Sequence, residues 1–302
     1  MIINPKRLYA TAAQRVGVYK ISDSDLKKLQ SVQLDILDDL IQVCKKENLT
    51  IILQAGTLIG AALYKGFIPW DDDIDLFMTR KEYDHLLEVF PKEFSHKYIV
   101  QTPKTEPSAT FGFMKIRKRD TSFVEVETFG FPMHKGIFID VCPLENAPDS
   151  RIKQIIHGVG CFVLKQITTA CALFRYRSTH MMVFRKHSIK LHAFMLIREI
   201  IGFFFSFLSV GKWNRITEAY CAKYKNRDAK YFVVPYSQDG YFKELYPKRL
   251  FLDTVLLEFE GRKLPAPATY DSILRMKYGD YTIIPPPEKR TQHWIAGIDF
   301  GD

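Results

Sequence analysis

The chain has 302 residues, of which 47% are hydrophobic and 25% charged, which is enough for a large buried core and argues against long disordered regions. Its five cysteines are far apart and form no Cys-x-x-Cys or Cys/His cluster, which argues against a disulfide framework or a structural zinc site and indicates a cytosolic protein. The formal net charge is +9, and the basic excess lies in residues 150–230, which hold 15 Lys or Arg and 3 Asp or Glu. A polyanionic substrate, an anionic membrane, nucleic acid or a solvated basic face would each suit this charge.

Helices and strands are predicted to alternate in the first half of the chain. Apolar residues at steps of three and four mark helices, and short apolar runs bounded by polar turns mark strands. The predicted helices cover residues 22–47, 58–64 and 80–90, and the predicted strands cover 51–53, 71–78, 111–117, 122–128 and 137–141. Pro91 is expected to end the third helix, and Pro143 the last of these strands.

The second half is predicted to begin with helices and to end in mixed structure. Residues 150–230 are helical and basic in pattern, and a strand over 255–259 and a short helix over 270–278 follow. This alternation predicts an α/β or α+β fold with a mainly helical insert. The chain is thereby divided into residues 1–149, the insert and a C-terminal part, 231–302.

The insert also bears on membrane contact. Its most apolar stretch, residues 200–210, is shorter than the about 20 residues that a spanning helix needs, so no spanning segment is predicted. Residues 180–207 mix basic with aromatic and aliphatic side chains. That mixture suits a helix lying on an anionic membrane surface, with peripheral contact through 180–210, or a helix packed on the core with its basic side in water.

Four aspartates crowd into five residues, at Asp71, Asp72, Asp73 and Asp75. In a strand, Asp73 and Asp75 point to the same face, Asp71 shares their parity, and Asp72 faces the other way. Paired carboxylates on one face suit a hard divalent cation, so Asp73 and Asp75 are predicted to bind Mg²⁺, with Mn²⁺ as an alternative. The alternative to a metal site is an acidic turn at the surface.

Five further residues suit such a site. Gly56 and Thr57 stand near the start of a predicted helix, where free amides attract phosphate, although an ordinary turn has the same residues. Asp140 is a lone carboxylate in an apolar strand; beside the aspartate strand it would complete a two-metal or metal-plus-base site, and otherwise it faces water at a strand end. Lys115 and Arg117 share one strand face and suit either phosphate binding or protection of an edge strand.

Longer motifs surround these residues. They are Gly56-Thr57-Leu58-Ile59-Gly60-Ala61, Lys65-Gly66-Phe67-Ile68-Pro69-Trp70-Asp71-Asp72-Asp73-Ile74-Asp75, Arg80 to Tyr83, Lys115-Ile116-Arg117-Lys118, Ile139-Asp140-Val141-Cys142-Pro143-Leu144, and a C-terminal block from Phe259-Glu260-Gly261 to His293. A Gly-Thr turn, an Asp-x-Asp strand and a third acid on a later strand resemble the nucleotidyltransferase fold of the DNA polymerase β type. The whole set resembles the LicD family of phosphocholine transferases, to which fukutin-related proteins are akin.

The resemblance implies transfer of phosphocholine from CDP-choline to a sugar hydroxyl of a cell-surface glycan, with release of CMP. The acceptor would be a teichoic acid or lipopolysaccharide-type precursor, free or lipid-linked. Asp73, Asp75 and Asp140 would be the catalytic metal ligands. The implied substrate-binding residues are Gly56, Thr57, Lys65, Trp70, Lys115, Arg117 and His293. Trp70 or a tyrosine would offer the quaternary ammonium an aromatic face, unless Trp70 belongs to the core.

The resemblance also assigns the parts of the chain. Residues 1–149 would form the nucleotidyltransferase-like core, which 231–302 completes, and 150–230 would contact the acceptor or a membrane. Two other reactions remain open: nucleotidyl transfer from a nucleoside triphosphate, and transfer of another head group such as phosphoethanolamine or a polyol phosphate. No nucleic-acid partner is expected, because a nucleic-acid binder has no need to bury acids. The protein is expected in the cytoplasm or peripheral at the inner face of the membrane.

Overall fold

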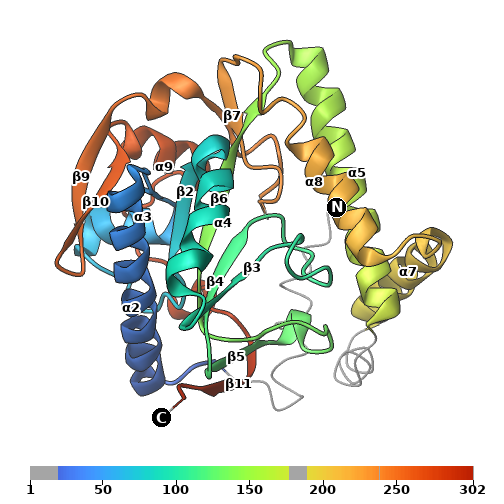
Figure 1. Ribbon diagram of the computed structural model, residues 1–302, viewed down its shortest axis with the longest axis horizontal. Coiled ribbons are helices and arrows are strands. Elements are labelled where there is room, and N and C mark those ends of the chain that lie inside the picture. The colour runs from blue at the N-terminus through green and yellow to red at the C-terminus, as the bar shows by residue number, and fades with distance from the viewer. Residues whose placement is uncertain (1–19, 177–188, 238, 302) are drawn as a thin grey trace.

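The computed structural model describes residues 20–176, 189–237 and 239–301. Within these residues, a mixed seven-stranded sheet forms the centre, with the order β1-β2-β6-β4-β3 and with β7 joining β6 to β8 (Figure 1). β2 runs parallel to β6, and the other neighbours are antiparallel. The strands are β1 Ile52–Leu53, β2 Asp75–Thr79, β3 Tyr98–Gln101, β4 Met114–Lys118, β6 Phe138–Ala147, β7 Tyr231–Val233 and β8 Leu245–Pro247. The predicted mixed α/β organisation is confirmed.

Helices and two antiparallel strand pairs surround this sheet. The α-helices are α2 Asp23–Glu47, α3 Ala55–Tyr64, α4 Arg80–Phe94, α5 Arg151–Arg175, α7 Ile189–Phe205, α8 Val210–Cys221 and α9 Tyr270–Tyr278. Short 3₁₀ turns cover Val126–Thr128, Lys248–Phe251 and Pro287–Lys289. The pairs are β5 Ser122–Glu125 with β11 Ile295–Asp299, and β9 Thr254–Phe259 with β10 Arg262–Pro267.

The main core lies between the sheet and the helices α2 and α4. Leu40 of α2 and Phe90 of α4 are fully buried in one cluster with Leu76 and Met78 of β2. Because side chains alternate along a strand, Asp75 points to the opposite face of the sheet. This alternation directs the acid of β2 away from α2 and α4.

The helices α5, α7 and α8 stand together at one side of the sheet, at the right in Figure 1. A hydrogen bond of 2.8 Å between the hydroxyls of Thr168 and Thr217 joins α5 to α8. Among the described helices, α5 is long and apolar enough to cross a membrane by length and composition, and 44% of its apolar window is buried. α7 and α8 meet the same test only if they are taken as one broken span, bent by 93°.

Two predicted boundaries on the first helices and strands are wrong. α3 begins at Ala55 rather than at residue 58, so Gly56 and Thr57 lie inside its first turn. α4 continues through Pro91 to Phe94. The proline removes one backbone donor near the helix end, and the burial of both Phe90 and Phe94 in the core keeps the last turn in place.

The expected end of the strand at Pro143 is also wrong, since β6 continues to Ala147. The Asp140 amide donates to Ile74 of the β2 side, so the backbone of Pro143, three residues on, faces away from β2. On that side β6 pairs with β4 only up to Val141 and with β7 only from Glu145. Pro143 therefore sits where the sheet requires no N–H donor.

Candidate active site

Strand register brings three predicted site residues together. Asp75 of β2 lies opposite Asp140 of β6, and Asp140 lies opposite Lys115 of β4. Lateral neighbours in a sheet point to the same face, so the three side chains form one row. The Lys115 ammonium donates to Asp140 Oδ2 at 3.0 Å. The strand of Asp140 thus lies beside that of Asp75, which is the placement that the metal-site prediction requires.

Asp73 reaches the same region by a different route from the expected one. β2 begins only at Asp75, so Asp73 is in a loop and the predicted strand parity of Asp71 to Asp75 does not apply. Two glutamines of α2 hold this loop: Gln30 donates to the carbonyl of Asp71 at 2.9 Å, and Gln33 to that of Asp72 at 2.8 Å. The loop is therefore fixed through its backbone.

The acids crowd one another in a buried place. Burial and the neighbouring Asp73 raise the pKa of both Asp71 and Asp75 well above the ordinary value. Burial also raises the pKa of Asp140 to about 6, although Lys115 acts in the opposite direction. Asp140 Oδ1 and Asp71 Oδ2 are buried and have no hydrogen-bond partner. Buried, unpartnered carboxylate oxygens beside further carboxylates fit the oxygen ligands of a hard divalent cation.

Asp72 is buried and belongs to a different arrangement. Its carboxylate accepts from the backbone N–H of His293 at 2.7 Å and contacts His293 Nδ1 at 2.9 Å. Although burial acts against it, Asp72, Asp73 and Glu125 raise the pKa of His293 to about 10, so this imidazole is a cation. The sequence analysis gave Asp72 no role, and no spacing rule connects it with a histidine 221 positions later.

Ligand atoms of Asp72, Asp73 and His293 lie within 4.8 Å of one another. The predicted set of Asp73, Asp75 and Asp140 does not form such a compact group among the described residues. Both oxygens of Asp72 contact His293, one through its backbone N–H and one through Nδ1. Among the described aspartates of this region, the buried oxygens without a hydrogen-bond partner are Asp71 Oδ2 and Asp140 Oδ1.

Lys115 and Arg117 are both engaged inside the protein. Lys115 lies 3.3 Å from the centre of the Phe138 ring and neutralises Asp140. Arg117 is 1% exposed and donates to the Gln101 side chain at 2.6 Å and to the Gly136 carbonyl at 2.7 Å. The structure therefore places Arg117 as a buried brace, and not where a substrate phosphate could replace its partners.

Arg117 also acts on Glu125, at a distance of 3.4 Å. Burial favours the neutral carboxyl, but Lys115, His293 and Arg117 together lower the pKa of Glu125 to about 2. Glu125 in turn lies 3.8 Å from His293 Nε2. An alternating row of charges therefore joins Arg117 through Glu125 and His293 to Asp72, and Glu125 is a further member of the site that sequence reasoning missed.

The Gly-Thr motif positions the aspartates directly. Thr57 Oγ1 accepts the backbone N–H of Asp75 at 2.8 Å, which ties the first turn of α3 to the first residue of β2. Gly56 faces the Asp71 carboxylate so closely that a Cβ on residue 56 would overlap it. In this structure, Gly56 and Thr57 therefore position Asp71 and Asp75, a structural role that differs from the predicted binding of phosphate.

Lys65 and Trp70 lie toward the edge of the site. Lys65 is exposed at the far end of α3, about 15 Å along the helix axis from Ala55, so the structure does not bring it to the carboxylates. Trp70 is partly exposed, and the Arg290 guanidinium lies 4.1 Å from its ring centre. One face of Trp70 therefore already carries a cation from the C-terminal segment, a contact that the sequence analysis did not foresee.

A small pocket opens on the Asp75 side of the sheet. Its lining is mostly aromatic and aliphatic, with one amide and one ammonium, and includes Gln54, Phe77, Tyr246, Phe251, Lys277 and Tyr278. Gln54 Oε1 is buried there without a partner. Burial raises the pKa of Asp75, and Lys277 offsets part of that rise; the Lys277 ammonium bonds to the fully buried Glu244. The sequence singled out Tyr278 only within a motif, and Gln54 and Lys277 not at all.

Comparisons with known proteins agree with the motifs. A family model described as LicD/FKTN/FKRP, nucleotidyltransferase domain, matches residues 48–157. The chain is 30% identical over 272 residues to the lipopolysaccharide cholinephosphotransferase LicD of Haemophilus influenzae. The aligned region covers 89% of this chain and 96% of that protein. Uncharacterized proteins of Rickettsia prowazekii and Rickettsia typhi are 33% and 32% identical over 79 and 78 residues, 26% of this chain in each case and 28% and 24% of theirs.

Proposed function

Because the chain belongs to the LicD family, we propose that it is a phosphotransferase that moves phosphocholine from CDP-choline to a sugar hydroxyl of a cell-surface glycan and releases CMP. The relative along nearly the full length is named for transfer of phosphocholine to lipopolysaccharide. The observation that carries the proposal is the row of Asp75, Asp140 and Lys115 across three strands, with Asp73 beside it. Such a row suits phosphoryl transfer, which needs positioning and charge neutralisation more than covalent chemistry.

The carboxylates of Asp73, Asp75 and Asp140 would hold Mg²⁺ or Mn²⁺, with phosphate oxygens of the donor completing the widely spaced set. When bound, the ion would neutralise the diphosphate and the charge that develops on leaving CMP. Support comes from the buried, unpartnered Asp140 Oδ1. Since Lys115 holds the other oxygen of Asp140, Oδ1 is also the atom that can accept the proton of the acceptor hydroxyl.

Positive charge for the donor phosphates would come from His293 and Arg290 more than from Arg117. The guanidinium of Arg290 is stacked on Trp70 beside the acidic loop, and its one hydrogen bond among the described residues uses Nε, to the Pro285 carbonyl at 3.2 Å. Its two terminal nitrogens remain for phosphate oxygens. Arg117 would act indirectly, by holding Glu125 and through it His293.

The head group would lie on the Asp75 side of the sheet, where the cavity is about the size of one water molecule and would have to widen. A quaternary ammonium is attracted to aromatic faces, and Phe77, Tyr246, Phe251 and Tyr278 line this pocket. The face of Trp70 is less suited, since Arg290 already lies over it. We therefore place choline against these aromatic residues and the diphosphate at the carboxylate row, on a fold of the nucleotidyltransferase type.

The test is CMP release from CDP-choline with Mg²⁺ and a phosphocholine-free lipopolysaccharide acceptor, compared with release from CDP-ethanolamine. Acceptor-dependent release that is lost in Asp73→Asn and Asp75→Asn, and kept in the exposed control Asp228→Asn, is the expected result. Release from ATP instead of CDP-choline would favour nucleotidyl transfer, and preference for CDP-ethanolamine would favour another head group. Undiminished release in both active-site variants would refute the assigned site.

A further inference from the structure

The outward side of α5 is apolar over its first three turns. Its exposed hydrophobic residues are Ile152, Ile155, Ile156, Val159, Phe162 and Val163. Steps of three and four residues place them on one helix face. Ile156 is 62% exposed and Phe162 61%, which is unusual for side chains of this size in such a run. No described part of the chain covers this face.

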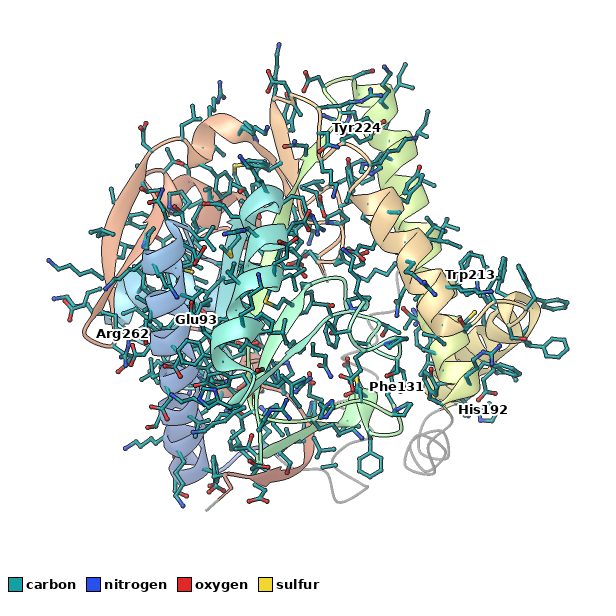
Figure 2. The ribbon with its side chains drawn as sticks, viewed as in Figure 1. Glu93, Phe131, His192, Trp213, Tyr224 and Arg262 are labelled. Carbon is teal, nitrogen blue, oxygen red and sulfur yellow. The ribbon has the colours of Figure 1, made fainter. Side chains whose placement is uncertain are left out.

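α7 lies on the continuation of the same face and adds its own apolar side. Gly202 of α7 lies against the Ala170 carbonyl and Phe174, and Arg198 donates to Gln166 of α5. On its outer side α7 exposes Ile197, Ile200, Phe203 and Phe204, and Phe207, two residues after the helix, is also exposed. Figure 2 shows the side chains of this helix projecting outward from the body of the molecule. The two helices thus expose a joined apolar surface, which we call the α5–α7 face.

The charges around the α5–α7 face are mostly of one sign. The sequences of α5, α7 and α8 contain eight Lys or Arg and two Asp or Glu. Arg151 and Lys153 are exposed at the start of α5, Arg175 at its end, and Lys212 and Arg215 on α8. One of the two acids, Glu218, is already paired with Lys104 at 3.2 Å. An apolar surface on helices of net positive charge matches the interface of an anionic bilayer.

The inner side of α5 argues against a helix that crosses a membrane. Gln154, His157 and Thr168 are buried against the protein, and His157 bonds to the Tyr241 hydroxyl and the Tyr220 carbonyl, both at 2.9 Å. A spanning α5 would have to break these contacts and place the polar groups in hydrocarbon. A helix that is anchored on its polar side and apolar on its outer side has the geometry of an interfacial element.

We propose that the α5–α7 face docks on the surface of an anionic lipid bilayer, with α5 and α7 lying in the interface. This extends the predicted contact through 180–210, of which residues 180–188 lie outside the described residues, to the first half of α5. The proposal does not rest on the proposed function, because it follows from exposure and charge alone. Docking would place the protein where a lipid-linked acceptor is found.

The experiment is sedimentation of the full chain with phosphatidylglycerol vesicles and with pure phosphatidylcholine vesicles. The wild type should bind the anionic vesicles more strongly, and added salt should weaken that binding. The double variant Ile156→Ser/Phe162→Ser and the single variant Phe204→Ser should each lower the partition coefficient about tenfold or more. The matched control is Leu256→Ser, since Leu256 is 63% exposed on β9, at the other side of the molecule in Figure 1.

Each variant is first checked for an unchanged melting temperature, so that loss of binding is not loss of folding. Vesicle binding that is equal in the wild type and the face variants would overturn the proposal. A wild type that ignores both vesicles but forms a dimer, which the face variants convert to monomers, would also overturn it and assign the α5–α7 face to a second copy of the chain. Because the readout is binding, failure of the transferase assay leaves this result unaffected.

Discussion

Replacement of Thr57 by valine tests how the Gly-Thr motif serves the site. Valine keeps the shape of threonine but removes the oxygen that accepts the Asp75 N–H at 2.8 Å, and Thr57 is 2% exposed, so water cannot replace it. A buried donor without a partner costs about 1–3 kcal/mol of folding free energy. With an unfolding entropy of about 2.1 cal/mol/K per residue, this corresponds to a melting temperature about 2–5 °C lower.

The same change should release the first residue of β2 and misplace the Asp75 carboxylate, so we expect the rate of CMP release to fall about 10- to 100-fold. The assays are differential scanning calorimetry and steady-state kinetics. Thr57→Ser is the control, because it retains the oxygen and should keep most of both properties. A valine variant as stable and as active as the wild type would refute the reasoning, and so would a serine variant as impaired as valine.

Three further changes have calculable effects. Arg80→Met leaves the fully buried Glu145 carboxylate without its main partner, and urea unfolding should show a loss of about 3–5 kcal/mol. Arg117→Met removes one of three cations near the buried Glu125. We expect a smaller loss in urea, with the Michaelis constant for the donor changed less than the rate. Burial lowers the pKa of His157 from 6.5, so near that pH the unfolded state binds a proton that the folded state does not. Stability should therefore fall as the pH drops through 6.5. In His157→Gln, melting curves should show a smaller fall.

An exposed neighbour of Arg80 provides the control for the first of these changes. Lys81→Met, one position after Arg80, should cost little, and a loss below about 1 kcal/mol in Arg80→Met itself would contradict a buried ion pair. A large rise of the donor Michaelis constant in a stable Arg117→Met would show that the guanidinium binds phosphate after all. An unaltered pH dependence in His157→Gln would mean that other groups cause it.

The sequence predicts well what depends on local pattern. The helices over 22–47 and 270–278 are found within a few residues, and each predicted strand of the first half overlaps an observed one, because each has a regular apolar pattern. Whether Asp140 would lie beside the aspartates depended on the order of the strands, which the apolar period does not reveal. The structure shows that order, since Asp75 of β2 lies opposite Asp140 of β6.

Contacts between distant segments account for what was missed. Asp72 was expected to face away from the site, and a histidine from the end of the chain meets it there. Arg117 was expected to share the role of Lys115, but Gln101 and Glu125 lie where a phosphate would have to bind. The boundaries predicted at Pro91 and Pro143 were wrong because the cost of a missing N–H depends on whether a neighbouring group needs that donor. Only the tertiary structure decides this.

Pro143 has a consequence for how the molecule opens. On the side of β6 away from β2, the ladder to β4 ends before Pro143 and the ladder to β7 begins after it, so the two share no rung. Asp140 and Lys115 belong to the first ladder, and the chain that leads into α5 belongs to the second. On the β2 side, the pairing of β6 runs unbroken from Asp140 to Leu144. Local unfolding can therefore start at the β7 pairing and stop at Leu144, where the β2 pairing begins, and amide hydrogen exchange should report less protection from Glu145 onward than at Asp140.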